Sequence, residues 1–156
     1  MVEIKIPGWP VLQIFHIVFD VNGTIAVDGN LLEGVVQKIH DLQIFYQVHL
    51  ITADTNKKQD QIDELLKFKA HRLISENETR QKQEFVHSLG VQNVIAVGQG
   101  ANDALMLQDA ALGICVLSKE GTCIEAMLHS DILVPDIYCA FDLIENPKRM
   151  IATLRK

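Results

Sequence analysis

Three short polar segments of the sequence carry side chains that could do chemistry. They run from Asp20 to Thr24, from Thr52 to Asp54 and from Gly98 to Asp103, and each follows directly on an apolar run. Together with Lys82 they offer a carboxylate nucleophile, a hydroxyl donor, an ammonium group and a second carboxylate. This set suits phosphoryl transfer, because an Asp can attack phosphorus while the other groups screen the charge of the phosphoryl oxygens.

Each of these groups can be given a role in that chemistry. Asp20 is the predicted nucleophile, and Thr52 and Lys82 would donate to the phosphoryl oxygens. Hard oxygen donors would hold Mg²⁺ between two anions, the Asp20 carboxylate and the phosphate. The residue types therefore predict catalytic roles for Asp20, Thr52 and Lys82, phosphate binding by the same three residues, and metal binding by Asp20 and Asp103.

The apolar run that ends at Asp20 indicates the fold class. Residues 14–19 are apolar except for His16, a pattern typical of a strand covered on both faces in a central parallel sheet. Similar runs follow at 46–51, 72–74, 93–97, 112–117 and 132–134, and helical patterns lie between them at about 31–45, 57–68, 78–89 and 122–128, near 105–107, and at 137–154 with Pro147 dividing the last. This alternation predicts an α/β fold, a three-layer Rossmann-like domain with a mostly parallel sheet. The polar segments would then meet at the carboxyl edge of the sheet, where ligands bind.

Two hairpins are expected beside this sheet. Residues 2–6 and 11–19 flank a turn from Pro7 to Pro10, so the start of the chain could add an edge hairpin to the sheet. Residues 25–27 precede a strong turn signal at 28–30, which predicts a small hairpin flap beside the loop of Asp20.

Composition narrows the function classes. The 156 residues, nearly half of them hydrophobic, predict one domain over 1–156 with a sizeable core. The net charge of -6 and the lack of a basic stripe argue against a nucleic-acid partner. No apolar run approaches the roughly 20 residues of a membrane span, and the first residues lack a signal-peptide pattern, so we expect a cytoplasmic protein without a membrane partner. The three cysteines have no CxxC spacing, which predicts reduced core thiols.

In their order and placement, these segments resemble the motifs of the haloacid dehalogenase (HAD) superfamily over residues 16–117. Within that superfamily, residues 51–54 and 100–105 are most similar to the phosphorylation domain of P-type ATPases. The resemblance implies an aspartyl-phosphate at Asp20, Mg²⁺ dependence and a phosphorylated substrate, whose identity the sequence does not indicate. It also implies a catalytic role for Asn22, metal binding by Asn22 and Gln99, and phosphate binding by Ala53 and Asn102. The short spans on either side of Thr52 leave no room for a substantial cap. Capless members take large substrates or cover the site by oligomerising, and both options stay open.

Two positions depart from the pattern of that family. Asn22 stands where the phosphatases usually have an acid–base Asp, so hydrolysis of an acyl phosphate should be slow by on the order of 10²–10⁴. Gln99 stands where the family commonly has an Asp that ligates Mg²⁺, and the missing charge should weaken the metal site.

Some features of the sequence bear on functions other than a phosphohydrolase or phosphotransferase. The absence of a carboxylate at both Asn22 and Gln99 also suits a non-catalytic module that binds phosphate or a protein partner, although the four motifs together favour the enzyme. The segment Gly98 to Gly100 resembles a dinucleotide loop only weakly, because no acidic ribose partner follows a next strand. A receiver-type phosphoacceptor would need paired acids at the end of the first strand. The six dispersed histidines fit packing or surface roles better than a metal site.

Overall fold

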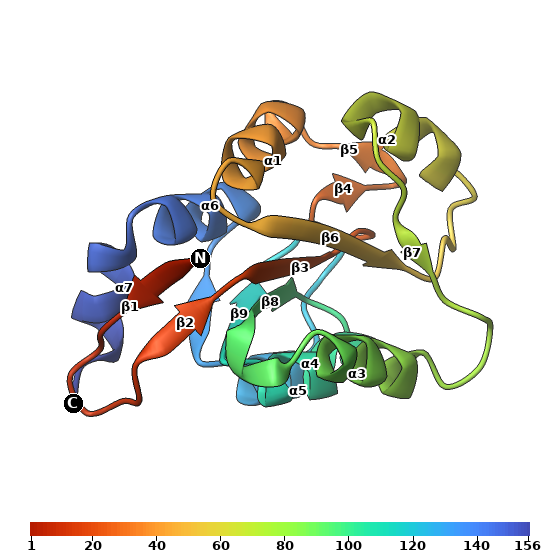
Figure 1. The fold of residues 1–156 in the computed structure, drawn as a ribbon. Helices are drawn as coiled ribbons and strands as arrows, with labels where there is room; N and C mark the ends of the chain where they lie inside the picture. The colour runs from red at the N-terminus through yellow and green to blue at the C-terminus, as the bar shows by residue number, and fades with distance from the viewer.

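A six-stranded parallel sheet forms the centre of the molecule. The computed structural model describes residues 1–156. The strands lie in the order β10-β9-β8-β3-β6-β7, and every neighbouring pair is parallel (Figure 1). Their bounds are β3 (His16–Asp20), β6 (Gln47–Thr52), β7 (His71–Arg72), β8 (Val94–Gly98), β9 (Leu112–Val116) and β10 (Ile132–Val134). The predicted α/β class and parallel sheet are confirmed.

Helices cover both faces of the sheet and give three layers (Figure 1). One face carries α1 (Val35–Gln43), α2 (Gln59–Leu66), α6 (Ile137–Glu145) and α7 (Pro147–Leu154). The other carries α3 (Glu78–Ser88), α4 (Ala104–Asp109) and α5 (Ile124–Leu128), with short 3-10 turns at Val91–Asn93 and Ala101–Asp103. Pro147 is the first residue of α7, which confirms the predicted division of the C-terminal helix.

The side chains of β3 supply the core on both of its faces. Phe19 packs in the larger apolar cluster and lies 5.3 Å from Phe141 of α6 between ring centroids, while Val18 joins Val86 of α3 in the smaller cluster. All three central residues of β3 are fully buried. Burial on both faces is the reason that this strand has an unbroken apolar sequence.

The N-terminal hairpin does not extend the central sheet. β1 (Val2–Ile4) and β2 (Leu12–Ile14) pair with each other in a separate two-stranded sheet, so the expected edge position is wrong. The reason lies at Phe15, whose N–H donates to Asn93 and whose carbonyl accepts from Gln47. Because Phe15 already belongs to the central ladder, the hairpin continues beyond the amino end of β3.

The same hairpin lies against the C-terminal end of the chain. The indole of Trp9 donates to the carbonyl of Leu154 at 3.0 Å, and the backbone N–H of Lys156 donates to the carbonyl of Pro7 at 3.2 Å. Both chain ends therefore lie beyond the amino ends of the strands, on the left in Figure 1.

The predicted flap is present as β4 (Ala26–Val27) and β5 (Asn30–Leu31). It uses residues that we expected to start the first helix, so α1 begins later, after Gly34 in a left-handed conformation. The predicted strand at 72–74 is also shorter and shifted, because only His71 and Arg72 pair with β6.

None of the helices is long and apolar enough to cross a membrane. All three cysteines are free, as predicted, and Cys115 is fully buried in β9. Burial raises the pKa of its thiol to about 11, so this sulfur stays protonated and packs as an apolar group.

Candidate active site

Strand register brings the three polar segments to one edge of the sheet. Asp20 pairs with Ile51 across β3 and β6, and Phe19 pairs with Val97 across β3 and β8. Asp20, Thr52 and Gly98 therefore end three adjacent strands at the same level. These strands point to the right in Figure 1, so the candidate site lies at the end of the molecule opposite the chain termini.

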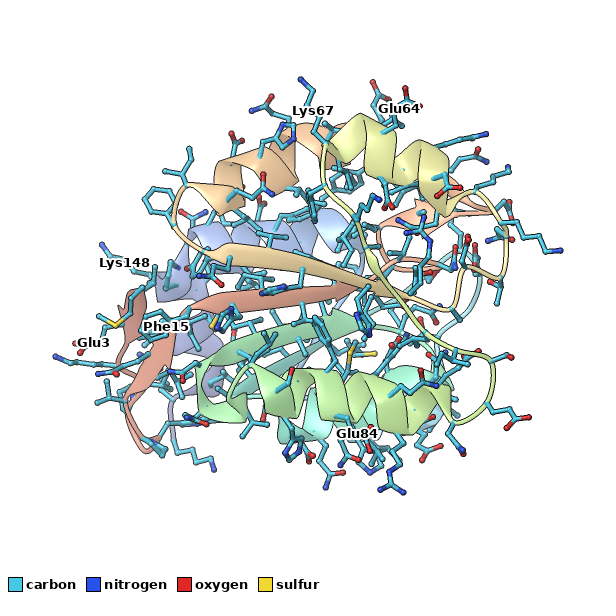
Figure 2. All side chains as sticks on the ribbon, turned by 45° about the vertical axis from the view of Figure 1, so that its right-hand side comes forward. Glu3, Phe15, Glu64, Lys67, Glu84 and Lys148 are labelled. Carbon is cyan, nitrogen blue, oxygen red and sulfur yellow. The ribbon has the colours of Figure 1, made fainter.

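Lys82 reaches this edge from the inner face of α3. Its side chain is fully buried, and Nζ lies 2.6 Å from Asp20 Oδ1, 2.6 Å from Asp103 Oδ1 and 3.1 Å from Asn102 Oδ1. Glu84, two residues further along the helix, points to solvent on the opposite face (Figure 2), where it pairs with Arg80. Helical periodicity thus places the buried Lys82 on the opposite face of α3 from the solvated charges around it.

Asp103 holds the loop after β8 in place. Its Oδ2 accepts the backbone N–H groups of Gln99 and Gly100, both at 2.8 Å, while Oδ1 accepts from Lys82. Three donors thus occupy a fully buried carboxylate. This geometry makes Asp103 the partner of Lys82 and the anchor of the loop, and its role as a metal ligand stays a prediction.

Burial and charge act in opposite directions on the Asp20 carboxyl. Burial, followed by the nearby Asp103, raises the pKa of Asp20 to about 7, while Lys82 and a 3.0 Å hydrogen bond from Thr24 lower it. Burial alone would lower the pKa of Lys82, but Asp103 and Asp20 raise it above its ordinary value. The lysine is therefore charged at neutral pH, and the carboxyl titrates in the physiological range.

Asn22 ties together the loops around Asp20. Its amide nitrogen donates to the hydroxyls of Thr52 at 3.2 Å and Thr55 at 3.4 Å, and its amide oxygen accepts from Asn56 at 3.1 Å. A carboxylate at position 22 could not donate in this way. The side chain therefore holds the loop after β6 against the loop after β3.

Gln99, which follows β8, contacts the loop after β3. Its Nε2 donates to the backbone carbonyl of Asn22 at 3.2 Å. Gly23, at φ +83°, makes this approach possible, because a β-carbon there would collide with the Gln99 amide.

The oxygen donors on this side fit a hard cation. No group of three His, Cys, Asp or Glu side chains could hold a metal by itself. The available donors are the Asp20 carboxylate, the backbone carbonyl of Asn22 and the side-chain amide of Gln99. Rotation of that amide by a half-turn about its last bond would exchange its nitrogen for its oxygen next to the Asn22 carbonyl. Each Asp20 oxygen accepts only one hydrogen bond from the protein, so lone pairs remain free on both.

An open cleft of about 360 Å³ lies over these groups. Its lining comprises Asp20, Asn22, Ala53, Thr55, Gln99, Gly100, Ala101, Asn102 and Glu120. Thr52, Lys82 and Asp103 are fully buried beneath it. The structure thus brings every residue predicted for the site to one edge of the sheet and adds Glu120, which follows β9. The same strand-end rule, applied to the run at 112–117, is the signal that could have found it.

Searches among known proteins find relatives of part of the chain. No protein-family model matches it. The uncharacterised protein MJ0073 of Methanocaldococcus jannaschii is 48% identical over 64 residues, which cover 41% of this chain and 69% of that protein. A probable copper-exporting P-type ATPase of Archaeoglobus fulgidus is 34% identical over 108 residues, which cover 68% of this chain but 13% of the ATPase.

A solved phosphatase shares the fold over almost the whole chain. The structure is that of 3-deoxy-D-manno-octulosonate 8-phosphate phosphatase from Moraxella catarrhalis in complex with magnesium, phosphate and KDO. Its TM-score is 0.64 at 17% identity, and the match covers 91% of this chain and 94% of that one. The chain therefore has the fold of the HAD superfamily, as its motifs predicted. It belongs to the same family as MJ0073, and part of it is homologous to a region of the copper-exporting ATPase.

Proposed function

We propose that this chain is a HAD-type phosphohydrolase or phosphotransferase that accepts a phosphoryl group on Asp20. The observation that carries this proposal is the Asp20 carboxylate at the floor of the cleft, held by Lys82 and Thr24. An Asp20 oxygen would form a bond to phosphorus as the bond between phosphorus and the leaving oxygen breaks, and the leaving oxygen would take a proton from water. The substrate would be a phosphorylated compound whose leaving group stays outside this open cleft.

Polar groups around Asp20 are suited to hold the transferred phosphoryl group. Thr52 Oγ1 accepts hydrogen bonds from Asn22 and from the N–H of Asp54, which leaves its own O–H free to donate. Lys82 is a permanent positive charge in contact with the nucleophile. Ala53 and Asn102 line the cleft on either side. Donors fixed before the reaction stabilise developing charge without reorganisation.

Asp20, the Asn22 carbonyl and Gln99 would hold Mg²⁺, and Asp103 is a further candidate. Bound there, the ion would neutralise the repulsion between the carboxylate and the phosphoryl oxygens. Among the residues of the chain, Lys82 orients the Asp20 carboxylate through the 2.6 Å contact of its ammonium. The Asn22 amide does not ionise and so does not act as a general base toward water, and the aspartyl-phosphate would therefore break down slowly.

Incubation with acetyl phosphate and Mg²⁺ tests this proposal. We expect intact-mass spectrometry to detect a phosphorylated protein, with the modification on Asp20 and sensitive to hydroxylamine. Asp20→Asn should abolish it. Asp28→Asn is the matched control, because Asp28 lies beside the cleft and uses only its backbone N–H and carbonyl in hydrogen bonds. Absence of label on the unmodified protein would refute the proposal.

A non-catalytic phosphate-binding module is the second candidate. It is favoured by the bonds of Asn22 and Gln99, which fasten the catalytic loops to one another with amides. On that hypothesis inorganic phosphate binds in calorimetry, while acetyl phosphate leaves Asp20 unmodified.

A further inference from the structure

Glu120 is the second carboxylate of the cleft. It stands on the exposed loop that follows β9, and among the cleft-lining residues it and Asp20 alone carry a negative charge. Asp103, the other acid of the site, is buried beneath the cleft and fully engaged by N–H donors. A ligand entering the cleft therefore meets Glu120, not Asp103.

One oxygen of Glu120 is fixed and the other is free. Oε1 accepts the backbone N–H of Asp28 at 2.7 Å, which ties the loop after β9 to the flap. Oε2 accepts no hydrogen bond from the protein, and it lies 3.2 Å from where a β-carbon on Gly23 would stand. The Gln99 amide lies next to the same point. The free oxygen thus faces the nucleophile loop beside Gln99.

We infer that Glu120 supplies the second carboxylate ligand of the cation site and so replaces the charge that Gln99 lacks. The buried cluster of Asp20, Asp103 and Lys82 has a formal charge of −1, which is a weak match for a divalent ion. Glu120 brings the site to −2. Affinity of oxygen sites for hard cations rises with the number of charged ligands.

This arrangement also joins the cation site to the flap. Oε1 of Glu120 accepts the N–H of Asp28 while Oε2 faces Gln99, so the side chain contacts both the flap and the proposed cation site. A cation on Oε2 would hold Glu120 in its present rotamer and thereby hold the flap against the loop after β9.

The inference rests on the proposed function, because the cation is the one that would serve Asp20. Titration of the full chain with Mg²⁺ in a calorimeter tests it, with thermal unfolding as a second readout. Glu120→Gln keeps an oxygen for the N–H of Asp28 and removes only the charge. We expect Mg²⁺ affinity and the Mg²⁺-induced rise in Tm to fall, the affinity by about tenfold or more.

Glu125→Gln is the matched control. Glu125 is exposed on α5, five residues further along, and its side chain makes no hydrogen bond or ion pair, so Mg²⁺ affinity should be unchanged. Equal Mg²⁺ affinity of Glu120→Gln and the unmodified protein would overturn the inference and leave Glu120 as a latch for the flap. If Asp20 is still phosphorylated in that case, the proposed function stands without it. If Glu120→Gln loses affinity but Asp20 is never phosphorylated, the cation site stands and the proposed function fails.

Discussion

The ammonium of Lys82 lies 2.6 Å from Oδ1 of Asp20, and both side chains are buried although 62 residues separate them in the sequence. A buried ion pair of this kind adds little net stability over apolar packing, but removal of one partner leaves an uncompensated charge. The pair therefore links the fold to the candidate site, because the ammonium that contacts the proposed nucleophile also compensates buried negative charge in the core.

Lys82→Met should destabilise the fold. It leaves Asp20 and Asp103 buried without a counter-charge, for which we expect a loss of about 3–5 kcal/mol in the free energy of unfolding. Urea denaturation checks this. Lys148→Met serves as the control, since Lys148 is exposed on α7 at the opposite end of the molecule (Figure 2) and should change stability by less than about 0.5 kcal/mol. Comparable losses for the two variants would refute the structural role of Lys82.

Asn22→Asp should accelerate turnover. A carboxylate at position 22 can protonate the leaving oxygen and then activate water, a gain of on the order of 10² or more in hydrolysis. Steady-state assays with p-nitrophenyl phosphate and the lifetime of the phosphoenzyme measure the effect. Asn56→Asp places the same charge at the neighbouring contact of the loop and should give no such gain. A longer-lived phosphoenzyme in Asn22→Asp would contradict the prediction.

Gln99→Asp should strengthen cation binding. The substitution adds a negative charge beside the Asn22 carbonyl, and we expect Mg²⁺ affinity to rise by about tenfold. Calorimetry measures it directly. Gln92→Asp, in the 3-10 turn at the amino end of β8, is the control and should leave the affinity unchanged. No gain at position 99 would mean that its side chain does not reach the ion.

Phosphorylation should depend on pH through Asp20. Only the ionised carboxylate attacks phosphorus. In the metal-free protein burial and Asp103 raise the pKa of this group to about 7, so the initial rate at limiting Mg²⁺ should rise with pH through that value. Thr24→Val removes a hydrogen bond that lowers this pKa and should move the rise to higher pH. Rates of acetyl phosphate labelling across the pH range test both statements. A profile that is flat through pH 7 would contradict them.

His16 and His49 should make stability sensitive to acid. Their ring nitrogens Nδ1 and Nε2 lie 3.1 Å apart, and burial lowers the pKa of both, with His16 lowering that of His49 further. The unfolded chain binds protons from about pH 6.5 downward, so this contribution to stability is complete above that pH and is lost as the pH falls through the lowered values. Urea unfolding at pH 7.5 and 5.5 should show a smaller acid loss in His49→Gln. His129→Gln is the control.

The sequence predicted the strands and the site because both depend on local patterns. The run ending at Asp20 is apolar on both faces, and its observed strand stops at the predicted residue. The sequence is less informative about residues whose placement depends on contacts with distant segments. The register that aligns Asp20 with Ile51, and the strand order that puts β3 in the middle, come from packing and not from any one segment.

Amide and loop contacts account for what the sequence could not reveal. In the sequence Asn22 stands only for a missing acid, whereas in the structure it also donates to the hydroxyls of Thr52 at the end of β6 and of Thr55 in the loop that follows. Glu120 lies after a strand in an exposed loop without a recognisable motif, and only the fold brings it close to Gly23. The hairpin of β1 and β2 has the expected pairing, but its position is set by Phe15, whose bonds go to two other segments.

The contacts of Trp9 with Leu154 and of Lys156 with Pro7 gather both chain ends at the amino side of the sheet, away from the cleft. A fluorescent reporter, an affinity tag or a surface linker fused to either end would therefore leave the mouth of the cleft accessible. Immobilised protein should thus present Asp20 to macromolecular phosphorylated compounds as freely as protein in solution does.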